Sequence, residues 1–298
     1  MAKRKRPARP KLIKDSTDAQ FDDSLVDYSP PDSGYDRKFE EEDTTENLYG
    51  VGARTFPQSL WIPQSEWKDW ARENDRMKIW AENFRNRFTN QSPTHECTCH
   101  ALIQGFEAAW NAQRSSRKSA VFMSALSVYA EANPRVRGGS SMQKTVGIAI
   151  RRGILPEYNG PNGEGSQKDL FTHTLNCTAG KGNSQCSSGP WVSVSKFPNG
   201  WKDTARHFRA NEVINCESWE QMICCLLQGR VVCVGRKGHA IPYNRVLWRD
   251  GRLYVAYSDS YDVVRYDSMS NIRQAVGGSY CIWSTTIPEN WDNPTGGV

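Results

Sequence analysis

Cys97 stands where a polar turn containing Pro93 runs into an apolar helical pattern. The apolar residues that follow recur at helical spacing: Ala101, Leu102, Phe106, Ala109 and Trp110. This places Cys97 at or just before a helix N-terminus, where unpaired backbone N–H groups and the positive end of the helix dipole favour an anion. A thiol at such a position is biased toward the nucleophilic thiolate. We therefore expect acyl-transfer chemistry, which needs an imidazole partner and an oxyanion donor.

His239 is the best-placed imidazole partner for Cys97. It lies at the start of a predicted strand beside two flexible glycines, so its ring can reach across a cleft. A third group has to accept a hydrogen bond from the second ring nitrogen, and Asp259, at the end of a later strand, suits that role. The other four histidines lie in the same local turn as Cys97 or in loop-like or exposed sequence: His95, His100, His173 and His207.

The elements that position these residues are predicted to be helical first and extended second. Helices are expected over residues 65–88, 97–113, 119–132, 142–153 and 218–227. Strands are expected over residues 230–234, 240–248, 253–257 and 280–285, with Asp250-Gly251 as a hairpin turn. Residues 157–211 are rich in Gly, Asn, Ser and Lys and are expected to form loops with short elements. This order predicts an α+β fold with an antiparallel sheet.

The order Gln, Cys, His, Asp resembles that of the papain-like cysteine peptidases. Gln91 precedes Cys97 by six residues, the family's spacing between its oxyanion-hole glutamine and its nucleophile. Cys-Thr-Cys-His-Ala at residues 97–101 looks like the Cys-x-Gly-His-Ala form of bacterial and bacteriophage members. Residues 126–129, 138–157 and 217–241 are similar to later family segments, so the resemblance covers roughly residues 57–285. Where the family usually has Asn-Ser-Trp-Gly, this chain has Asp-Ser-Tyr-Asp at residues 259–262.

The resemblance implies a papain-like α+β fold, in which a helical half carries the nucleophile helix and packs on an antiparallel β-sheet half. The active site would lie in the groove between them. It implies a cysteine-type endopeptidase with Cys97 as nucleophile, His239 as proton carrier, Asp259 orienting the ring and Gln91 in the oxyanion hole. It implies a polypeptide substrate and neither a cofactor nor a metal. Cys99 is a rival nucleophile, because residues 99–102 imitate the family's Cys-x-Ala-aromatic run; the glutamine spacing favours Cys97.

The N-terminal residues 1–56 are predicted to be a disordered arm. Residues 1–14 contain seven basic residues, whereas residues 15–46 contain twelve acidic and two basic ones, and high charge with few large apolar residues favours disorder. The arm could dock on a partner, fold back as a pro-segment or act as a plain tether. The peptidase domain is predicted to span residues 57–288, followed by a tail over residues 289–298.

Composition sets the expected surroundings. No apolar run approaches the roughly 18 residues of a membrane span, and the basic N-terminus lacks the apolar region of a secretory signal. Nine cysteines, an odd number, fit a reduced context, so we expect a cytoplasmic or virion-associated protein. Nucleic-acid binding would rest on residues 1–14 alone and is not expected. Two alternatives stay open: a catalytically weak or inactive papain-like structural protein of a phage particle or complex, and a cell-wall amidase or thiol acyl-transferase.

Overall fold

The computed structural model describes residues 52–77, 96–112, 123–132, 140–156, 197, 200–236, 239–259, 263–274 and 278–286. Most of the predicted arm, Gln91, His95, His173 and the C-terminal tail lie outside these residues. The side chain of Asp259 is not described either, although its backbone is.

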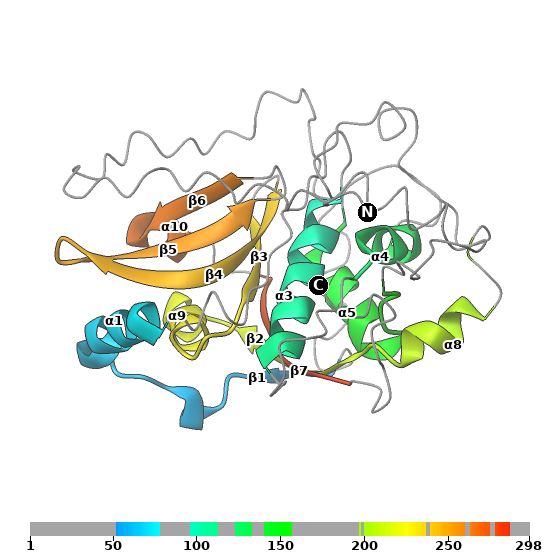
Figure 1. Ribbon diagram of the computed structural model, residues 1–298, viewed down its shortest axis with the longest axis horizontal. Helices are drawn as coiled ribbons and strands as arrows, with labels where there is room; N and C mark the ends of the chain where they lie inside the picture. The colour runs from blue at the N-terminus through cyan, green and yellow to red at the C-terminus, as the bar shows by residue number, and fades with distance from the viewer. Residues whose placement is uncertain are drawn as a thin grey trace, which may run out of the picture.

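In the described part of the chain, most helices precede most strands (Figure 1). The α-helices are α1 (Trp67–Met77), α3 (Cys97–Ala112), α4 (Ala125–Ala132), α5 (Met142–Arg151), α8 (Trp201–Arg206), α9 (Trp219–Leu227) and α10 (Met269–Gln274), with short 3-10 turns at Gln58–Leu60 and Gln64–Glu66. The strands are β1 (Ala53–Thr55), β2 (Ala210–Cys216), β3 (Val232–Arg236), β4 (His239–Arg249), β5 (Arg252–Asp259), β6 (Val263–Ser268) and β7 (Ser279–Thr285).

The seven described strands form one sheet in the order β1-β2-β7-β3-β4-β5-β6. Every neighbouring pair is antiparallel except β1 and β2, which are parallel, so the sheet is mixed rather than purely antiparallel as predicted. The predicted α+β class is confirmed. In Figure 1, β4, β5 and β6 lie on one side of α3 and the helices α4, α5 and α8 lie on the other.

Both faces of the central strands are buried. Because successive side chains of a strand point to opposite faces, neighbouring residues belong to different clusters. Along β3, Cys233 belongs to the cluster formed with α3, α4 and α5, whereas Val232 and Val234 belong to the cluster formed with α1 and α9. Along β4, Ala240 belongs to the first cluster and Ile241 to the second. We call these the α3 cluster and the α9 cluster.

Helix α3 is buried almost all round and packs directly on the sheet, as expected for the helix that begins at Cys97. Its closest approach to β3 is at Gly105, where a Cβ would lie 2.6 Å from the Sγ of Cys233. The Cys233 thiol also donates a hydrogen bond to the Ala101 carbonyl at 3.1 Å. Glycine at position 105 therefore sets the spacing between α3 and the sheet.

Several predicted local signals are confirmed. Ser141 caps α5 and Gly153 follows its end with φ +89°. Ser218 accepts a hydrogen bond from the Gln221 N–H at 3.3 Å at the start of α9. Asp250 and Gly251 both have positive φ, as a two-residue hairpin turn between β4 and β5 requires.

Other predictions need correction. The helix expected from residue 119 begins only at Ala125, because Met123 is held by a β-bridge to Pro156. Residues expected to form loops contain α8 and the start of β2, and the predictions omitted β1, β6 and α10 altogether. Strand β1 takes into the sheet three residues assigned to the arm. In α1, Trp67 is buried as expected, but Trp70 is 40% exposed.

No helix in the described part of the chain is long and apolar enough to cross a membrane.

Candidate active site

Cys97 is the first residue of α3. The preceding carbonyl, that of Glu96, accepts the first hydrogen bond of the helix from the His100 N–H at 2.9 Å. The Cys97 side chain thus lies at the positive end of the helix dipole, where a thiolate is stabilised. Cys97 is only 3% exposed, so its side chain belongs to the α3 cluster and does not lie on an open surface.

The β3–β4 hairpin packs along α3 and runs toward its N-terminal end. A Cβ at Gly105 would lie 3.8 Å from Val231, whereas Cys233, two residues further along, also contacts Ala101. Two more residues of β3 rise about 7 Å, and four residues of helix from Ala101 back to Cys97 rise about 6 Å. The hairpin therefore reaches the level of Cys97 near Gly235, whose partner in the ladder is Ala240.

His239 begins β4 at this same end of the hairpin. Ala240, the next residue, belongs to the α3 cluster together with Cys97. His239 itself pairs with Arg236 and is partly exposed. By strand alternation, position 239 shares a face of β4 with Ile241 of the α9 cluster, whereas Ala240 between them lies on the face of Cys97.

Asp259 is the last residue of β5, where it pairs with Val263 of β6. Tyr257 pairs with Tyr243 of β4, and two further residues of β5 carry the chain toward the beginning of β4. The backbone of Asp259 therefore lies at the same end of the sheet as His239, the first residue of β4. Cys97 thus shares a cluster with Ala240 at the start of β4, and the end of β5 that carries Asp259 lies at the same end of the sheet, whereas Gln91 lies outside the described residues.

Cys99 is a poor nucleophile in this structure. It is fully buried, and burial, followed by the negative charge of Glu96, raises the pKa of its thiol well above the usual value. Such a group stays protonated at neutral pH and is inert as a nucleophile. Of the two cysteines at the start of α3, the electrostatics favour Cys97.

Glu96 and His100 form a buried pair that the sequence analysis did not use. Glu96 Oε2 lies 3.5 Å from His100 Nε2, and the His100 side chain is completely buried. In the described residues neither ring nitrogen makes a hydrogen bond, which is unusual for a buried imidazole. The i, i+4 spacing was the available signal. The pair therefore places a carboxylate and an imidazole within one helical turn of Cys97.

Among the described residues, no group of three or more His, Cys, Asp or Glu side chains is arranged to hold a metal ion. The seven described cysteines are buried free thiols.

The chain was compared with known proteins in three ways. No protein-family model matches the chain, and no curated protein matches its sequence. Among solved structures, it is similar to xylellain, a cysteine protease from Xylella fastidiosa, with 13% identity, a TM-score of 0.45, and coverage of 67% of this chain and 83% of that one. It is also similar to digestive procathepsin L 3 of Tenebrio molitor larval midgut (11%, 0.48, 80% and 78%) and to a recombinant stem bromelain precursor (12%, 0.45, 80% and 75%). The roles of residues in those proteins are not transferred to this chain.

Proposed function

We propose that this chain is a papain-like cysteine peptidase that hydrolyses peptide bonds. The observation that carries the proposal is the position of Cys97 at the first residue of α3, beside the hairpin end that carries His239. A thiol at a helix N-terminus with an imidazole within reach is the arrangement that nucleophilic acyl transfer needs.

The proposed reaction begins with proton transfer from the Cys97 thiol to His239, which gives a thiolate and an imidazolium. The thiolate attacks the amide carbonyl, and the Cys97 backbone N–H and the Gln91 side chain stabilise the oxyanion, each such donor being worth about 3 kcal/mol. The C–N bond then breaks, and His239 gives its proton to the departing amine. A water molecule, activated by His239, hydrolyses the thioester. Asp259 keeps the imidazole in the required orientation.

The partners follow from this chemistry. The substrate is a polypeptide, held in a groove between the helical part and the sheet. We keep as part of the proposal that the N-terminal arm is a pro-segment or a docking segment. We also keep the cytoplasmic or virion-associated setting, and the bacterial or bacteriophage origin suggested by the motif at residues 97–101.

Hydrolysis of casein and of fluorogenic peptides by purified protein, under reducing conditions, tests the proposal. Cys97→Ala is expected to abolish hydrolysis, and Cys99→Ala is the matched control, expected to retain it because the Cys99 thiol is buried and protonated. Loss of activity in Cys99→Ala alone, at unchanged stability, would transfer the role to that residue. Digestion of peptidoglycan but not casein would instead indicate a cell-wall amidase.

A second candidate function is supported by the 3% exposure of Cys97. A thiol so well covered also suits a papain-like structural protein without catalysis. An electrophilic thiol probe separates the two proposals: labelling of Cys97 in the folded protein supports the peptidase, and a folded sample in which Cys97 stays unlabelled supports the structural protein.

A further inference from the structure

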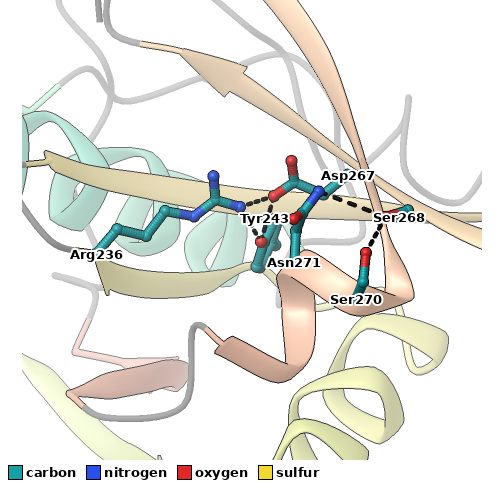
Figure 2. A network of polar contacts seen from close by, with 6 residues as sticks. All are labelled: Arg236, Tyr243, Asp267, Ser268, Ser270 and Asn271. Atoms are coloured by element: carbon teal, nitrogen blue, oxygen red, sulfur yellow. Dashed lines mark hydrogen bonds and ion pairs between the residues drawn. The ribbon is translucent and has the colours of Figure 1, made fainter. Parts of the chain in front are cut away.

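Arg236, Tyr243 and Asp267 form a largely buried polar network (Figure 2). The guanidinium Nη2 of Arg236 pairs with Asp267 Oδ2 and also donates to the Tyr243 hydroxyl. That hydroxyl donates in turn to Asp267 Oδ2 at 2.5 Å. Burial raises the pKa of Tyr243 to about 12, so its hydroxyl keeps the proton that it donates.

The network is closed off from water. The Asp267 side chain is 0% exposed and that of Arg236 is 18% exposed. The guanidinium carbon of Arg236 lies 5.4 Å from the ring centroids of both Tyr243 and Tyr257, which themselves meet edge to face. A cation over two desolvated aromatic faces adds attraction to the ion pair.

Four neighbouring strands meet in this network. Arg236 ends β3 and is the ladder partner of His239; Tyr243 lies four residues after His239 on β4. Tyr257 lies two residues before Asp259 on β5, and Asp267 lies on β6. The same side chains therefore tie together the strand ends that carry the candidate imidazole and its candidate carboxylate.

Stability alone does not explain such a network. Desolvating two charges costs about as much as their pairing returns, and apolar side chains of similar volume usually serve as well or better. A buried network does, however, favour one geometry, because each of its hydrogen bonds has a preferred length and direction, although in the described residues Arg236 Nε makes no hydrogen bond. In the described residues, Oδ1 of Asp267 makes no hydrogen bond, so Oδ2 alone provides the attachment.

We infer that Arg236, Asp267 and Tyr243 are positioning residues: their network holds the β3–β4 hairpin so that the His239 imidazole stays aligned with Cys97. The inference rests on the proposed function for its effect on catalysis, but not for its effect on the hairpin. Since none of the three residues reaches the reacting atoms in this account, they act through His239.

The test compares two double variants of the full chain. The network variant combines Arg236→Met with Asp267→Asn, which removes both charges so that no buried ion is left unpaired. The matched control combines Arg245→Met with Asp75→Asn, which removes an ion pair between α1 and the middle of β4. Amide hydrogen exchange, the denaturant midpoint, and kcat and KM for a peptide substrate are measured for both, together with the single variants Arg236→Lys and Arg236→Met.

We expect the network variant to exchange amide protons at residues 239–241 about tenfold faster than the control, with a similar denaturant midpoint. We expect its kcat to fall by about 10- to 100-fold at nearly unchanged KM, since small displacements of a catalytic group cost that much. Arg236→Lys should keep more of kcat than Arg236→Met, because it retains the cation. Equal exchange and equal kcat in the network and control variants would overturn the inference.

The readouts separate this inference from the proposed function. If the wild type hydrolyses no peptide but the network variant still exchanges faster at residues 239–241, the proposed function fails and the positioning of the hairpin stands. If the wild type is active and exchange does not change, the positioning fails alone. Should the network variant not fold, Tyr243→Phe replaces it, with a smaller change in the same direction expected and no change overturning the inference.

Discussion

The contact between Gly105 and Cys233 makes a quantitative prediction about how α3 is held. A Cβ at position 105 would lie 2.6 Å from the Cys233 Sγ, whereas non-bonded heavy atoms approach comfortably at about 3.5–4.0 Å. In Gly105→Ala, α3 and β3 must therefore separate by about 1 Å. Overpacking of this kind costs up to about 3 kcal/mol, and the better helix propensity of alanine returns about 1 kcal/mol. We expect a net loss of about 2 kcal/mol of unfolding free energy.

Removal of the opposing sulfur should relieve the clash. The next nearest atoms to the added Cβ belong to Ile282 and Val231, at the ordinary contact distances of 3.6 and 3.8 Å. Cys233→Ala alone loses the thiol's packing and its hydrogen bond to Ala101, about 1 kcal/mol. The double variant Gly105→Ala/Cys233→Ala should then return close to the wild type, a coupling of about 3 kcal/mol between the two sites.

Equilibrium denaturation in guanidinium chloride under reducing conditions gives the four free energies of this cycle. The peptidase rate is a second readout, because a displacement of about 1 Å between Cys97 and the hairpin should lower kcat by about 100-fold in Gly105→Ala. The reasoning is refuted if Gly105→Ala lies within about 0.5 kcal/mol of the wild type, or if Cys233→Ala fails to rescue it.

Three further predictions concern stability. Burial raises the pKa of the Cys99 and Cys233 thiols, so the native state keeps protons that the unfolded chain releases above about pH 8.5. The unfolding free energy should therefore fall above that pH by up to about 1.4 kcal/mol per pH unit and thiol, and Cys233→Ala should reduce this slope in urea titrations. Ser218→Ala removes the cap of α9 and should cost about 1 kcal/mol, and an unchanged denaturant midpoint would contradict the assigned cap. Asp267→Leu leaves Arg236 as an unpaired cation and should cost about 3–5 kcal/mol, clearly more than the network variant, whereas an equal cost would argue against a buried ion pair.

Local signals in the sequence were sufficient for the elements that carry the candidate site. Helix α3 follows from the spacing of apolar residues after Cys97, and its predicted range matches the observed one to within a residue. The Asp250-Gly251 turn fixed the β4–β5 hairpin, because both positions need positive φ. These features depend only on neighbours in the chain, which is why they could be predicted.

Long-range pairing accounts for what was missed. Strand β1 has only three residues and is stabilised by β2, about 160 residues later. Strand β2 has register shifts that break its alternation of buried and exposed residues. Strand β6 carries Asp267, and a charged residue read alone argues against a buried strand. Its partner Arg236 lies 31 residues earlier, so no local sequence pattern predicts this ion pair.

The proposed mechanism requires that the Cys97 thiol is ionised and that His239 maintains this ionisation. Iodoacetamide labelling from pH 4 to pH 10, quantified for each cysteine by peptide mass spectrometry, measures this in one experiment. We predict that Cys97 reacts well below the usual thiol pKa of about 8.5, that Cys99 does not react in the folded protein, and that His239→Ala moves the labelling of Cys97 to higher pH. Unchanged pH dependence of Cys97 labelling in folded His239→Ala would contradict the account.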